Sequence, residues 1–131
     1  MKRFAFVITL ALAGPALALP PLSTVGPIND GLRSIMIADQ IRIACPSISP
    51  RMITAWSFIR GLEAEARKMG YSETQIEDFV ESKSERKRLE SEAAAYMKAR
   101  GVVGGKPETY CALGRQEIEK GSQIGAFLKV K

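Results

Sequence analysis

The sequence predicts an all-α fold: a small bundle of four to five helices held by one disulfide, with an extended N-terminal arm and a C-terminal tail. Three observations predict it. Apolar residues recur at spacings of three and four over most of the chain beyond residue 29, as they do on the inner face of amphipathic helices. Glycine, proline and serine interrupt this pattern at intervals typical of short helices. Cys45 and Cys111 are the only cysteines of the 131-residue chain.

Residues 1–18 have the form of a secretory signal peptide. Lys2 and Arg3 provide the positive start, an apolar stretch covers residues 4–13, and Ala16-Leu17-Ala18 offers the small residues that a signal peptidase recognises. The apolar stretch is too short to stay in a membrane as an anchor. We therefore expect cleavage between Ala18 and Leu19, and a periplasmic or secreted location.

The next segment, residues 19–28, contains three prolines and one glycine. Proline fixes the backbone and removes a hydrogen-bond donor, so this composition favours an extended arm over a helix. The rest of the chain, residues 29–131, has the length of one domain with one core. We therefore expect a signal peptide at 1–18, an arm at 19–28 and a single helical domain at 29–131.

The first two helices are predicted on either side of a proline-rich turn. The first covers residues 32–44, with Asn29-Asp30 available as its N-cap, and ends before Pro46. The second opens with Ser49-Pro50, which supplies an N-cap residue and a proline at the first helical position, and stops at Gly70.

Three further helices follow. Ser72 to Gln75 fits a capping box and starts the third helix. A break is expected near Ser82 to Ser84, where the apolar pattern lapses into charged residues, and a fourth helix continues to Gly101. The fifth starts at Pro107 and ends at Gly121, the residue type that most often caps a helix.

Single residues refine this prediction. Trp56 is the only tryptophan and lies on the apolar stripe of the second helix, so we expect it to anchor the core. Gly61 lies inside the same helix, which indicates a close crossing of two backbones there. The tail, residues 122–131, alternates apolar residues at a period of two and predicts a strand or an extended arm across the helices.

The two cysteines predict one structural disulfide between Cys45 and Cys111, because an even pair in a small exported chain most simply forms one bridge. In the chain-entropy description, a loop of this size stabilises the fold by about 4 kcal/mol. A redox enzyme is disfavoured because there is no Cys-x-x-Cys sequence, and a metal site because two thiols without histidine are a poor ligand set. We expect no cofactor and no metal.

The formal net charge is +5, and the loss of Lys2 and Arg3 with the signal lowers it by two. This weak, interspersed charge is unlike the basic stripe of a nucleic-acid binder, so no nucleic acid is expected as a partner. Contact with a membrane surface through anionic lipid headgroups stays open. The sequence has no histidine, which excludes catalysis by Ser-His or Cys-His pairs and leaves carboxylate chemistry alone.

Three apolar residues are candidates for a partner surface. Ile37 and Ile43 lie off the main apolar stripe of the first helix, and Phe127 lies in the apolar tail. Because the first helix has apolar residues on more than one side, we expect it to be covered on more than one side, either by its own fold or by a partner. We therefore take Ile37, Ile43 and Phe127 as the candidate partner surface.

The segment from Tyr110 to Leu128, together with Ala44-Cys45-Pro46 and the signal, resembles a family of short exported alphaproteobacterial proteins classed as a domain of unknown function. The resemblance covers most of the mature chain. The family has no established catalytic residues, so none is transferred. It is associated with the gene neighbourhood of the respiratory NADH dehydrogenase, and the resemblance thus implies an accessory subunit or assembly factor on the periplasmic face of that complex.

These observations together predict a non-enzymatic periplasmic protein that acts by binding, with a protein partner and most plausibly as an accessory to a membrane respiratory complex. Two alternatives stay open. A small stand-alone envelope enzyme, such as a carboxylate-based hydrolase, would need two carboxylates in a deep pocket. A carrier of lipid or of a small hydrophobic ligand would need an enclosed apolar cavity between the helices.

Overall fold

The structure, a computed structural model, describes residues 18–131 of the chain. The predicted signal peptide lies outside the described residues except for Ala18, which is exposed, as is Leu19 on the other side of the predicted cleavage site. The elements in chain order are η1 (Leu22–Thr24), α1 (Gly26–Ala44), β1 (Ile48–Pro50), α2 (Met52–Lys68), α3 (Glu73–Glu81), α4 (Lys83–Ala99), α5 (Pro107–Lys120), α6 (Gln123–Ala126) and β2 (Leu128–Val130).

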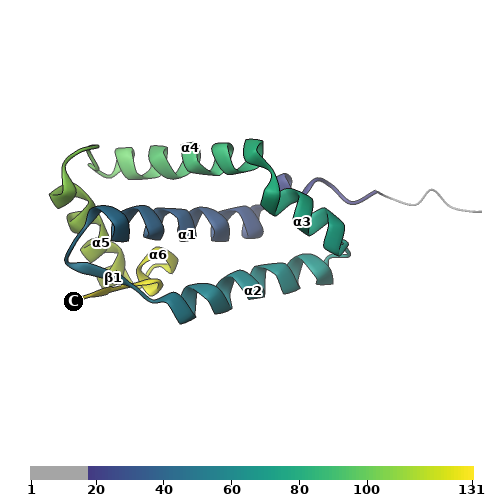
Figure 1. The fold of residues 1–131 in the computed structure, drawn as a ribbon, viewed down its shortest axis with the longest axis horizontal. Coiled ribbons are helices and arrows are strands. Elements are labelled where there is room, and N and C mark those ends of the chain that lie inside the picture. Colours follow the sequence, from purple (N-terminus) through teal and green to yellow (C-terminus); the bar gives the residue numbers. More distant parts are fainter. Residues whose placement is uncertain (1–17) are drawn as a thin grey trace, which may run out of the picture.

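Three long helices determine the shape of the molecule. Figure 1 shows α1 between α4 and α2, with α3 joining α2 to α4 at one end. At the other end, α5, α6 and the β1–β2 pair pack together beside the last turns of α1. The first described residues lie near α3, and the C-terminus lies at the opposite end of the molecule. The prediction of an all-α bundle with one disulfide is confirmed.

The predicted helix ends are largely confirmed. Gly70 follows α2 with a φ of 101°, and Gly121 follows α5 with a φ of 64°, so both adopt the left-handed backbone that glycine tolerates best. Ser72 and Gln75 form the predicted capping box at the start of α3. Ser82 ends α3 and caps α4 by accepting a hydrogen bond from the Glu85 amide. The break between the two helices therefore has a local cause.

The N-terminal arm differs from its prediction. After Pro21 the chain forms the short helix η1, and α1 begins at Gly26 rather than near Asn29. Pro27 does not prevent this, because it lies in the first turn, where the missing amide has no partner to lose. Asn29 holds the turn in place: its side-chain amide donates to the carbonyl oxygens of Leu22 and Val25, each at 2.8 Å.

The segment Ser49-Pro50 belongs to a strand and not to a helix start. β1 pairs in antiparallel register with β2, so that Ser49 lies opposite Lys129 and Pro50 opposite Leu128. The Arg51 amide donates to the Phe127 carbonyl at 2.7 Å, and α2 begins one residue later. The alternating tail therefore forms a strand only in its second part, because Ser122 caps the short helix α6 before it.

The core contains two clusters of buried side chains. The larger one surrounds the disulfide between Cys45, which follows α1, and Cys111 in α5, whose Cα atoms are 5.1 Å apart. The smaller one joins η1 and the start of α1 to the α2–α3 turn, where the Tyr71 hydroxyl donates to the Pro20 carbonyl at 2.5 Å. Within residues 18–131, no helix is long and apolar enough to cross a membrane.

Close packing of α1 against α2 occurs at a glycine other than the predicted one. A Cβ on Gly31 in α1 would lie 3.0 Å from both terminal methyl carbons of Leu62, so this glycine lets α1 and α2 meet. A Cβ on Gly61, by contrast, would have no heavy atom within 4 Å. The prediction of a helix crossing at Gly61 is wrong, because that side of α2 faces open space.

Candidate functional site

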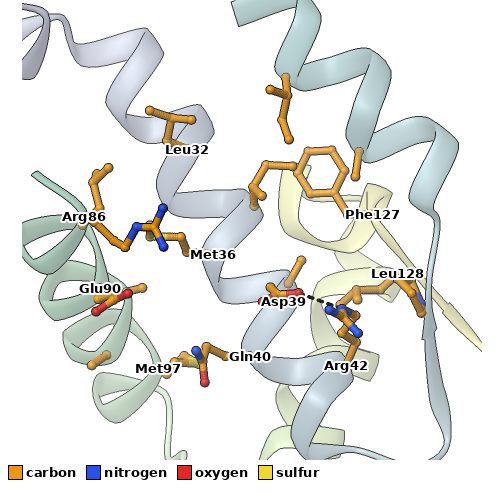
Figure 2. Close-up of a pocket in the computed structure, with 18 of the residues that line it drawn as sticks. Leu32, Met36, Asp39, Gln40, Arg42, Arg86, Glu90, Met97, Phe127 and Leu128 are labelled. Atoms are coloured by element: carbon orange, nitrogen blue, oxygen red, sulfur yellow. Dashed lines mark hydrogen bonds and ion pairs between the residues drawn. The ribbon is translucent and has the colours of Figure 1, made fainter. Parts of the chain in front are cut away.

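A largely apolar groove with a volume of about 730 Å³ lies between α1, α2 and α4. Its floor is α1, and its walls are α2 on one side and α4 on the other, with α3 closing one end. Figure 2 shows Leu32 and Met36 on the floor, Met97 of α4 on one side, and Phe127 on the side toward α2. The groove is partly enclosed by its walls and partly open to solvent.

The sequence spacing of three helices creates this groove. Leu32, Ile35 and Met36 lie three and four positions apart in α1, and they form a second apolar stripe next to the buried one. From α4, the small side chains of Ala93 and Ala94 line the opposite wall and leave room between the helices. α1 therefore buries one stripe in the core and presents the other to the groove.

Large apolar side chains remain exposed at the groove. Met52 and Trp56 of α2 and Val80 of α3 line it and are more than half exposed. The prediction that Trp56 anchors the core is wrong, since its side chain is 60% exposed. The guanidinium carbon of Arg60 lies 4.8 Å from the centre of the indole ring, a cation–π contact on the surface.

The charged groups of the groove are few and lie toward its edges. The Arg42 Nε donates to the Asp39 carboxylate at 2.7 Å, and Figure 2 shows this pair on α1. Arg86 and Glu90, one turn apart on α4, extend over the groove from the other side. The carboxylate of Glu85, which also lines the groove, is ion-paired with Arg88. The interior of the groove is thus apolar and its borders carry both signs of charge.

The predicted partner surface is not brought together. Ile37 is 1% exposed and Phe127 2% exposed, and both belong to the core, so the prediction is wrong for these two residues. Ile37 lies on the side of α1 that packs against the rest of the bundle, and the Phe127 ring packs against Phe58 at a centroid distance of 5.0 Å. Only Ile43, in the last turn of α1, is exposed.

A buried carboxylate lies apart from the groove. Glu117 of α5 has no exposed surface, and its carboxylate accepts hydrogen bonds from the hydroxyls of Tyr96, at 2.8 Å, and of Ser122. Burial alone would raise the pKa of Glu117, but these hydrogen bonds and the Lys120 ammonium at 3.5 Å lower it below its ordinary value. Burial and the bond to Glu117 raise the pKa of Tyr96. The cluster joins α4, α5 and α6.

A second polar network joins α1 to α4. Arg88 donates to the buried Asn29 side-chain oxygen at 2.6 Å and to Glu92 at 2.8 Å, and Arg33 of α1 reaches Glu92 at 3.4 Å. The charged stretch that begins α4 is therefore partly turned inward, where it fixes the spacing of the helices that border the groove. Among residues 18–131, no three acidic or cysteine side chains are grouped as metal ligands would be.

Comparison with known proteins gives one match. A family model described as "Family of unknown function (DUF5333)" matches residues 20–129, which is nearly all of the part of the chain that the structure describes. No curated protein and no solved structure matches the chain significantly. The match confirms the part of the predicted resemblance that concerns a family of unknown function.

Proposed function

The chain belongs to a family of unknown function, DUF5333. From this premise we propose that it is a non-enzymatic accessory protein, and that its groove binds an amphipathic helix of a partner protein. The proposed setting is the periplasm, on the outer face of a membrane respiratory complex. This setting follows from the signal-like N-terminus and the sequence resemblance. The Cys45–Cys111 disulfide supports an oxidising compartment, where such bonds persist.

The observation that carries the proposal is the set of exposed apolar side chains at the groove. Met52, Trp56 and Val80 are each more than half exposed although the helices around them are fully formed. Apolar side chains exposed together beside an apolar floor are typical of interaction sites. An aromatic anchor such as Trp56 is the residue type that most often dominates the binding energy of an interface.

The dimensions of the groove favour a helix as its occupant. The stretch of α1 from Leu32 to Arg42 forms the floor, which is about 15 Å at the rise of an α-helix. Three turns of a partner helix have this length and present anchors at positions i, i+3, i+4 and i+7. Pockets for small ligands enclose most of the ligand surface, whereas this groove is only partly enclosed. Charges of both signs at the borders suit the polar flanks of such a helix.

Ala94 and Ala95 offer a matched pair of variants. Both are exposed and adjacent in α4, but only Ala94 lines the groove. Ala94→Arg should place a long charged side chain into the groove, whereas Ala95→Arg makes the same change outside it. We expect the tagged native protein and Ala95→Arg to recover the same membrane complex in stoichiometric amount from mild detergent, and Ala94→Arg to lose it.

The readout is mass spectrometry of the recovered proteins, with crosslinking from a photoreactive residue at position 80 to identify the segment in the groove. Recovery of the complex by all three proteins would overturn the groove as the binding site. Recovery of the chain alone by all three would overturn a stable accessory subunit. A copurified lipid or small apolar molecule, lost in Ala94→Arg, would favour a carrier instead.

A further inference from the structure

The outer face of the first half of α2 carries exposed apolar residues that the core does not account for, and the most exposed of them, Ile53, does not line the groove. Ile53 is 88% exposed, the most exposed large apolar side chain among the described residues. Met52 and Trp56, one turn apart, are also more than half exposed. We call Met52, Ile53, Trp56 and Arg60 the α2 patch. It lies at the end of the molecule where β1 leads into α2 (Figure 1).

Helix geometry places the members of the α2 patch side by side. At about 100° per residue, Trp56, Arg60 and Ile53 fall within an arc of about 60°, with Met52 at its edge. The residues that pack inward, Phe58, Leu62 and Ala66, lie on the other side of the helix. The Arg60 guanidinium stacks over the Trp56 ring at 4.8 Å, so a cation lies directly beside the exposed indole.

The charges nearest to the α2 patch are mostly basic. The stretch from residue 40 to residue 62 contains three arginines and no acidic residue, although Arg42 is ion-paired with Asp39 and Glu63 follows one turn after Arg60. β2 adds Lys129 and Lys131 alongside β1, since Lys129 lies opposite Ser49 and the Lys131 amide donates to the Ser47 carbonyl at 3.0 Å. In α4, by contrast, acidic and basic residues are mixed. Arg51, Arg60, Lys129 and Lys131 thus add basic groups near the exposed apolar residues of the α2 patch.

We propose that the α2 patch docks the protein onto an anionic lipid surface. Tryptophan, isoleucine and methionine next to arginine are the side chains of an interfacial helix, whose apolar face enters the boundary between headgroups and acyl chains. Tryptophan prefers this depth because its ring is amphipathic. The arginines and lysines complement the negative headgroups, which a partner protein of mixed charge would not require. The inference goes beyond the proposed function, because its ligand is a lipid surface and because Ile53 and Arg60 do not line the groove, although Met52 and Trp56 border both surfaces.

Trp56 reports directly on this contact, because it is the only tryptophan of the chain. The protein is mixed with vesicles of phosphatidylethanolamine and phosphatidylglycerol, or with phosphatidylcholine vesicles as the neutral reference. We expect the indole emission to move to shorter wavelength and the protein to sediment with the anionic vesicles only. Both effects should be lost near 1 M salt, where the screening length falls to about 3 Å.

Substitutions test the role of each part of the α2 patch. Ile53→Asp should reduce vesicle binding at least about tenfold by removing apolar surface and adding a negative charge, and Arg60→Gln about fivefold. Two controls change similar side chains elsewhere: Val103→Asp in the exposed loop after α4, and Lys98→Gln at the end of α4. Both controls should bind vesicles almost as well as the native protein. Circular dichroism checks that all four variants are folded.

The inference is overturned if the native protein neither sediments with the anionic vesicles nor shows the emission shift. It is also overturned if Ile53→Asp binds as well as Val103→Asp, or if the neutral vesicles bind equally. The result is separable from the proposed function, because Ala94→Arg should lose the partner helix but keep vesicle binding. Ile53→Asp, at a position that does not line the groove, should lose vesicle binding but keep the partner helix.

Discussion

The hydroxyl of Tyr96 in α4 donates a hydrogen bond to the carboxylate of Glu117 in α5 at 2.8 Å, and this carboxylate has no exposed surface. Ser122, which caps α6, donates to the other carboxylate oxygen. One buried charge thus connects three helices at the end of the bundle that holds the disulfide. A buried carboxylate with these partners stabilises the fold only while it is ionised.

We therefore predict a loss of stability in acid that depends on Glu117. Its pKa in the folded protein lies below the ordinary value of 4.5, so its contribution is complete above that pH and is lost as the pH falls through the folded pKa. Glu117→Gln should unfold about 1–3 kcal/mol more easily at pH 7 and show a weaker dependence on pH below 4.5. Urea unfolding of both proteins at pH 7 and pH 3 measures this. An unchanged acid dependence in Glu117→Gln would assign the effect to other groups.

The disulfide gives a second prediction. Cys45 and Cys111 join the end of α1 to α5 within the larger core cluster. The variant with serine at both positions should lose about 4 kcal/mol, which lowers the melting temperature by roughly 15 °C or more. Helical circular dichroism at low temperature should stay close to that of the native protein. Mass analysis of the native protein without reducing agent should find it about 2 Da lighter than its reduced form. Free thiols in that protein would contradict the bridge.

Sequence reasoning located the helices well where the signal is local. The capping box at Ser72, the break at Ser82 and the stops at Gly70 and Gly121 each depend on neighbouring residues, and all are present. The disulfide was predictable too, because the chain has a single pair of cysteines. Local rules thus account for most of the secondary structure.

The sequence-based predictions are wrong where residues far away in the chain determine the local structure or the burial of a side chain. Ser49 and Pro50 have the chemistry of a helix start, but β2 at the far end of the chain recruits them into a strand. Ile37, which we expected on a partner surface, is buried, and Trp56, which we expected in the core, is exposed. Periodicity shows that a helix has an apolar side, but not which neighbour covers it. The groove itself could be anticipated only from the second apolar stripe of α1, at Leu32, Ile35 and Met36.

The different burial of Ile37 and Trp56 predicts how much unfolding free energy is lost when each is replaced by alanine. Trp56→Ala should change the free energy of unfolding by less than about 1 kcal/mol, because the side chain is mostly in solvent. Ile37→Ala should cost about 2–5 kcal/mol, because it leaves a cavity in the core. Urea unfolding followed by circular dichroism measures both without relying on the tryptophan. A larger loss of unfolding free energy for Trp56→Ala than for Ile37→Ala would contradict the exposed position of Trp56.

Replacing Gly125 or Gly61 by alanine should change the free energy of unfolding in opposite directions. At Gly125, in α6, a Cβ would overlap the backbone carbonyl of Glu117, which cannot move without displacing α5 from α6. We expect Gly125→Ala to destabilise the protein by about 2 kcal/mol or more.

At Gly61, inside α2, a Cβ would have no heavy atom within 4 Å, and alanine is the better helix former. Gly61→Ala should therefore stabilise the protein by about 1 kcal/mol. Because both variants add one methyl group to a helical glycine, the difference between them isolates the effect of the surroundings. Thermal unfolding of the pair measures it. A destabilised Gly61→Ala would mean that another helix crosses α2 there, and a neutral Gly125→Ala would mean that α6 does not pack on the Glu117 carbonyl.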